Sequence, residues 1–162
     1  MALTRTTPDE VRAVLGVSDE ELEDATLDLK VFTDQLELEL SDIDSTLPAL
    51  LDSILATPVL SRTAAQTKVF TVANMFSAYA VAKTLLTSLP LFSPKKVTDG
   101  RAEFERFADP FEAVRNGVNA GYVSIRARLQ AALALLSGYT PPAAITPIFT
   151  VAAPLAVDPV TA

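Results

Sequence analysis

The sequence predicts an all-α protein: a bundle of about five helices with a long C-terminal helix and an extended, proline-rich C-terminal arm. Two observations predict the bundle: apolar residues recur every three or four positions, and four capping boxes mark helix starts. A third predicts the arm, because five of the eleven prolines follow residue 139. We therefore divide the chain into a helical domain, residues 1–138, and an arm, residues 139–162. With 49% apolar residues, the chain can bury a substantial core.

The first two helices are predicted from their caps. In Thr7-x-x-Glu10 each side chain can satisfy the other residue's backbone amide, so a short helix is expected from about Pro8 to Leu15, with Gly16 ending it. Ser18-x-x-Glu21 predicts a second helix from about Asp19 to Asp42. Its buried stripe comprises Leu22, Ala25, Leu29, Phe32, Leu36, Leu40 and Ile43.

The next two helices are separated by a break at Thr57-Pro58. A third helix is expected from Thr46 to Ala56, because Pro48 is tolerable in a first turn. Thr63-x-x-Gln66 begins a fourth, from about Ala64 to Leu89, which is apolar nearly all round and is therefore expected to be the central core helix. The stretch 69–92 is the one membrane candidate, but a central lysine and Pro90 favour a buried helix.

The last helix has the clearest pattern, after a loop expected from Pro90 to Gly100. Its apolar residues, spaced by three or four, are Phe104, Phe107, Phe111, Val114, Val118, Tyr122, Ile125, Leu129, Leu133 and Leu136. Asp109-Pro110 lies inside this run, so either the helix kinks there or a new helix begins with Asp109 as its cap; Gly138 closes it. Gly117 and Gly121 either allow a close helix approach or merely weaken the helix, and both interpretations stay open.

The composition excludes several chemistries. The chain has no Cys and no His, which excludes disulfides, thiolate or imidazole metal sites and histidine general bases. The acids at Glu20, Glu21, Glu23 and Asp24 suit a helix N-terminus, and Asp42-x-Asp44 lacks the rest of a calcium loop. We therefore predict no enzyme, no metal and no cofactor, and rank a carboxylate–metal enzyme as the least favoured hypothesis.

Charge is distributed unevenly along the chain. The net charge of −7 comprises −11 over residues 1–60, +5 over residues 61–136 and −1 over the rest. The basic residues form no concentrated strip, and the pI is about 4.5, so nucleic-acid recognition is disfavoured. This asymmetry suits oriented assembly, although solvated helix faces also explain it.

The arm combines prolines with apolar residues that a disordered linker normally lacks. Its apolar residues include Ile145, Ile148, Phe149, Val151, Leu155 and Val157. Either the arm packs on its own domain, or it docks on a neighbouring subunit or partner. Both interpretations stay open.

Two stretches resemble head–tail connector (adaptor) proteins of tailed bacteriophages. The first is Leu3-Thr4-x-x-Thr7-Pro8-Asp9-Glu10-Val11-Arg12-Ala13-Val14-Leu15-Gly16-Val17-Ser18-Asp19-Glu20-Glu21-Leu22, and the second is Lys95-Lys96-Val97-Thr98-Asp99-Gly100-Arg101-Ala102-Glu103-Phe104-Glu105-Arg106-Phe107. In layout the resemblance covers about residues 1–136. The arm matches no motif of that family residue by residue.

The resemblance implies a structural virion protein made in the host cytoplasm and located in the neck between capsid and tail. It would form a homo-oligomeric ring, a dodecamer, around the DNA channel. Its partners would be the portal protein and a tail tube or nozzle protein. It would lie close to DNA without binding a specific sequence, and it would not contact a membrane. We predict that the six apolar arm residues named above bind the portal. We predict that Asp28, Glu37, Glu39, Lys95, Lys96 and Arg101 line the channel or the lateral interfaces. The alternative function is a free-standing helical binding or regulatory module that docks a partner through its arm.

Overall fold

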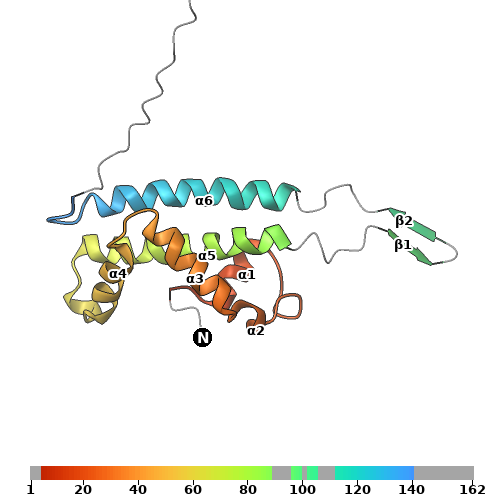
Figure 1. The fold of residues 1–162 in the computed structure, drawn as a ribbon, viewed down its shortest axis with the longest axis horizontal. Coiled ribbons are helices and arrows are strands. Elements are labelled where there is room, and N and C mark those ends of the chain that lie inside the picture. The colour runs from red at the N-terminus through yellow and green to blue at the C-terminus, as the bar shows by residue number, and fades with distance from the viewer. Residues whose placement is uncertain (1–4, 89–95, 100–101, 106–111, 141–162) are drawn as a thin grey trace, which may run out of the picture.

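Two long antiparallel helices form the axis of the molecule, α5 (Ala64–Ser88) and α6 (Glu112–Leu133), and the shorter helices pack against this pair, mainly against α5 (Figure 1). This computed structural model describes residues 5–88, 96–99, 102–105 and 112–140. The shorter elements are α1 (Pro8–Leu15), α2 (Asp24–Leu27), α3 (Lys30–Ser41), α4 (Leu47–Ala56) and the 3₁₀ turn η1 (Val59–Ser61). The predicted all-α helical bundle is confirmed.

The start of the chain folds as its local signals predict. The backbone amide of Glu10 donates to Thr7 Oγ1 at 3.3 Å, and the Thr7 amide donates to Glu10 Oε2 at 2.9 Å. Gly16 ends α1 with a φ of 70°, a left-handed conformation that costs glycine little. The boundaries of α1 are the predicted ones.

The predicted second helix, Asp19–Asp42, is wrong in its first half. Residues 19–21 form a turn, Leu22 lies in a bend, α2 is a single short turn of helix, and α3 begins only at Lys30. The cause is tertiary: the Arg12 Nε donates to the Leu22 carbonyl at 2.8 Å, an acceptor that a continuous helix would use itself. The Glu21 carboxylate still accepts from the Ser18 amide at 3.0 Å, but no helix follows this contact.

The other helix starts agree with the sequence except at the last helix. The Thr63 and Gln66 side chains form the predicted capping box before α5, at 2.9 and 3.1 Å, and α4 begins within one residue of its predicted start. The prediction that the last helix includes Phe104 is wrong, because Phe104 lies in a strand. β2 (Ala102–Glu105) pairs antiparallel with β1 (Lys96–Asp99), and α6 begins at Glu112. The strands also replace part of the loop expected before Gly100, and the cap role of Asp109 lies outside the described residues.

The core consists of two clusters, and α3, α5 and α6 contribute to both. The first unites α3, α4, α5 and α6 around Phe76 and Leu129, and the second unites α1, α2, α3, α5 and α6 around Val11 and Leu27. By length and composition alone α5 could cross a membrane, yet 56% of its most apolar window is buried inside the bundle. The predicted role of α5 as central core helix therefore agrees with its packing.

Candidate functional surfaces

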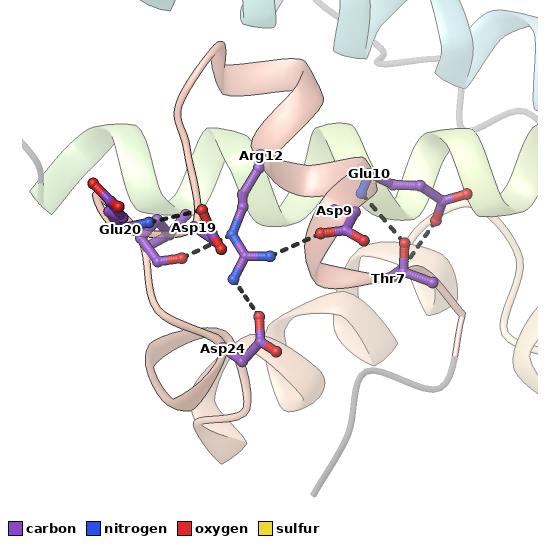
Figure 2. A network of polar contacts seen from close by, with 8 residues as sticks. Thr7, Asp9, Glu10, Arg12, Asp19, Glu20 and Asp24 are labelled. Carbon is purple, nitrogen blue, oxygen red and sulfur yellow. Dashed lines mark hydrogen bonds and ion pairs between the residues drawn. The ribbon is translucent and has the colours of Figure 1, made fainter.

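Arg12 is the centre of a polar network at the α1–α2 edge (Figure 2). Its guanidinium is buried, with Nη1 donating to Asp9 at 2.9 Å and Nη2 donating to Asp24. The hydrogen bond to Asp24 raises the pKa of the Arg12 guanidinium, against the opposing effect of burial. The network therefore ties α1 to the turn before α2 and keeps that turn out of a helix.

Acidic side chains surround an open pocket of about 700 Å³ beside this network. The lining residues are Asp9, Arg12, Ala13, Val17, Asp19, Glu23 and Asp24. Within the described ranges, no group of three or more Asp and Glu side chains is placed to hold a metal ion. The chemistry that the pocket offers is therefore a negatively charged surface for basic groups.

A second polar cluster joins α3, α5 and α6, and so links the acidic residues 1–60 to the basic residues 61–136. The Tyr122 hydroxyl on α6 donates to Glu39 on α3, and the Lys83 ammonium on α5 lies 3.6 Å from Glu39 and 4.0 Å from the centre of the Tyr122 ring. The Glu39 side chain is only 14% exposed. Its carboxylate therefore stabilises the bundle from within.

A third cluster fixes the chain beyond α6. The Tyr139 hydroxyl donates to Asp44 Oδ2 at 2.8 Å, and the Thr46 hydroxyl and amide both donate to Asp44 Oδ1 at 2.7 Å. The contacts with Thr46 lower the pKa of Asp44, assisted by Tyr139. The chain that leads to the arm is therefore held beside the start of α4.

Two tyrosines should make the fold sensitive to alkali. Burial, with the hydrogen bonds to Glu39 and Asp44, raises the pKa of Tyr122 and of Tyr139 to about 12. Because an unfolded tyrosine titrates near pH ~10, this contribution to stability is complete below about pH 10 and is lost as the pH rises to about 12. We expect urea unfolding to show a loss of about 1–2 kcal/mol per tyrosine over that interval.

The matched variants are Tyr122→Phe and Tyr139→Phe. Each should remove its share of the alkaline loss, because phenylalanine has no proton to release. An unchanged alkaline loss in the double variant would mean that other groups cause it.

The acids predicted to line a channel or interface occupy different environments. Glu37 receives a hydrogen bond from the buried Arg5 at 3.1 Å, and Glu39 is engaged as described above. Asp28 is half-buried at the end of α2 and has no ion pair recorded within the described residues. The assignment of these three acids to a channel or interface stays a prediction.

The remaining predicted site residues cannot be placed against these clusters. Lys96 lies in β1, opposite Glu105, but its side chain is outside the described part of the chain. Lys95, Arg101 and the six apolar arm residues also lie outside the described residues.

Sequence reasoning missed Arg12 and Tyr139 as organising residues. Arg12 had a usable signal: it is the one base between residues 6 and 29, and it lies three positions after Asp9. Tyr139 had none, because its partner Asp44 is 95 positions away along the chain.

Exposed apolar side chains occur on several parts of the described surface, of which three are candidate binding surfaces. Val31 and Leu38 lie on α3, Val123 lies on α6, and Leu55, Val59 and Leu60 lie within six residues of one another at the corner between α4 and α5. The α6 surface also carries exposed or half-exposed small residues with a spacing of three or four, namely Ala113, Gly117, Ala120, Ser124, Ala127, Ala131 and Ala134. These surfaces are the described places where another chain could bind without displacing the core.

Comparison with protein-family models, with curated proteins and with solved structures finds no match to this chain.

Proposed function

We propose that this chain is a structural head-to-tail adaptor that forms a homo-oligomeric ring, a dodecamer, between the portal and the tail of a tailed bacteriophage. The resemblance of residues 3–22 and 95–107 to connector proteins supports this function. The helical bundle of the described residues is compatible with it. The ring would lie in the virion neck and surround the DNA channel.

The observation that carries the proposal is the presence of two unlike surfaces on the bundle. One is formed by α1 to α4, from the zone with three bases and fourteen acids; the other is the exposed face of α6, with small side chains, exposed Val123 and exposed Arg128 (Figure 1). A ring closes through heterologous contacts, in which one surface of each subunit binds a different surface of the next. Opposite charge on the two surfaces favours one orientation of that contact.

Residues 1–60, which carry most of the acids, keep a net negative surface after their bases have formed ion pairs. Arg5, Arg12 and Lys30, the bases of residues 1–60, all form ion pairs inside the subunit. Among the described residues, the acids that form no ion pair include Glu20, Glu21, Glu23, Asp28 and Asp42. On a channel wall such acids would repel DNA phosphates and allow the DNA to pass, because phosphate contacts dominate DNA affinity.

The decisive experiment mixes the full chain with the portal protein of the same phage. We expect native mass measurement to show twelve copies on each portal ring and electron micrographs to show added density below it. Failure to bind the portal at micromolar concentration would contradict the proposal. A monomer in the absence of portal would not, because contact with the portal can induce ring closure.

A truncated chain tests the role predicted for the arm. Removal of residues 140–162 should abolish portal binding while the urea midpoint stays close to that of the full chain, since Tyr139 and its bond to Asp44 are retained. Unchanged portal binding would show that the bundle itself carries the contact.

A further inference from the structure

The corner between α4 and α5 exposes more large apolar side chain than any other described segment of similar length. Leu55 is 51% exposed, Val59 70% and Leu60 100%, all within six residues. Single exposed aliphatic residues are normal on protein surfaces, whereas a contiguous group marks a binding surface. We call Leu55, Val59 and Leu60 the apolar corner.

The apolar corner is held in place by hydrogen bonds. The Arg62 guanidinium donates to the carbonyls of Leu55 and Thr57, at 3.1 and 2.9 Å, and lies 5.0 Å over the Phe70 ring. Residues 55–61 contain no charged side chain, and the neighbouring Arg62 is turned toward the bundle, so the apolar corner is uncharged. The exposed Leu60 therefore lies in a turn that hydrogen bonds hold in one conformation. Such a turn loses little conformational entropy when it binds an apolar partner.

The C-terminal arm begins at the same end of the bundle. Figure 1 shows α4, the start of α5 and the end of α6 together at that end, and Tyr139 is fixed there by its bond to Asp44 just before α4. The ten residues of α4 span about 15 Å. The eight residues from 141 to 148 can extend over about 26 Å, so Ile148 and Phe149 are able to reach the far end of α4.

The chemistry of the arm matches the apolar corner. Residues 141–157 contain no charged side chain, and Ile148, Phe149 and Val151 follow closely on Pro147. A proline-rich segment favours an extended conformation, so it loses little conformational freedom when it docks. Attachment to the same bundle raises its local concentration to the order of millimolar, which favours the chain's own arm over that of another copy in dilute solution.

We propose that the apolar corner is the docking surface for the chain's own arm, with Ile148 and Phe149 packed on Leu60 in the free subunit. This inference stands independently of the adaptor function and needs no portal. The docked arm covers the apolar surface of the free subunit. A partner that takes the arm would expose the corner again.

Cross-linking in the full chain tests the contact, and the absence of cysteine makes labelling specific. Ser61→Cys is combined with Thr150→Cys and treated with a short bis-maleimide at low micromolar protein concentration. We expect a cross-link within one chain, detected by mass under denaturing conditions. The matched control combines Thr150→Cys with Ser124→Cys, an exposed position on α6 that should cross-link poorly.

Two further substitutions, each made in the chain that carries Ser61→Cys and Thr150→Cys, distinguish docking of the arm from random collision by their effect on the cross-linking yield. Leu60→Asp should lower the intramolecular yield about ten-fold, because it removes an apolar contact and adds a charge. Val123→Asp, at another exposed aliphatic residue, should leave the yield unchanged. Equal yields at Ser61 and Ser124, no effect of Leu60→Asp, or cross-links mainly between chains would each overturn the proposal.

Discussion

Phe76→Ala is expected to lower the free energy of unfolding by about 3–5 kcal/mol, a large share of the stability of a domain of this size. Phe76 is the largest side chain in the described core with no exposed surface, and it lies midway along α5. Its truncation leaves a cavity in the cluster that joins α3, α4, α5 and α6, which the surrounding helices can fill only in part.

The loss should extend to the neighbouring polar cluster. The Phe76 ring centre lies 5.3 Å from that of Tyr122, and the Tyr122 hydroxyl donates to Glu39. Without the phenylalanine ring, Tyr122 loses the surface that orients it. Phe76→Ala should therefore weaken the link between α6 and α3 as well as the apolar core.

Met75→Ala provides the matched control. Met75 is next to Phe76 on the same helix but is 45% exposed, so its truncation should change stability by no more than about 0.5 kcal/mol. Urea unfolding followed by circular dichroism measures both variants. Equal effects at the two positions would contradict the central place of α5 in the bundle.

Local signals predicted the helices wherever the decisive contacts lie within one turn. The Thr7–Glu10 and Thr63–Gln66 boxes each join residues three positions apart, and both form as predicted. The all-round apolar pattern of residues 64–88 likewise indicated a helix buried on several sides, and α5 contributes to both core clusters.

The errors arose where distant residues compete with a local pattern. The stripe from Leu22 to Ile43 fits one helix, but Arg12 binds the Leu22 carbonyl and Asp24 from another helix and thereby favours a turn. Periodicity along one segment does not contain that information. The sequence contains a signal for the hairpin, because Gly100, at the start of a two-residue link between short alternating segments, is typical of a tight β-turn, and the apolar spacing from Phe104 obscured it.

The candidate surfaces were harder to predict than the fold. Exposure of Leu60 follows from the orientation of the α4–α5 turn, which depends on hydrogen bonds from Arg62 to the carbonyls of Thr57 and Leu55 that residue type does not indicate. The engagement of Glu39 depends on Tyr122, 83 positions away. Residue type alone assigned Asp28, Glu37 and Glu39 to a channel or interface without distinguishing partnered acids from unpartnered ones.

Gly121→Ala and Gly117→Ala should have opposite effects on stability, although both replace a glycine in α6 by the best helix former. A Cβ atom at Gly121 would lie 2.1 Å from Tyr79 Cε1 and 2.9 Å from two further ring atoms. At Gly117 nothing lies within 4 Å of that position. Of the two glycines of α6, only Gly121 therefore lies at a close approach to α5.

The expected magnitudes follow from these distances. Gly121→Ala forces the Tyr79 ring or α6 to move and should cost about 1–3 kcal/mol, whereas Gly117→Ala should stabilise the protein by up to about 1 kcal/mol. Urea unfolding of the two single variants measures the difference in sign. Stabilisation by both substitutions would show that α5 and α6 are farther apart than this packing requires.

Removal of the tyrosine ring completes the test. In a Tyr79→Ala background the obstruction is absent, so Gly121→Ala should become neutral or stabilising, as Gly117→Ala is in the unmodified chain. The double-mutant cycle then assigns the cost to one contact between α5 and α6, because helix propensity contributes equally in both backgrounds. Persistence of the cost without the ring would place the obstruction in the backbone of α5 and would contradict the contact with Tyr79.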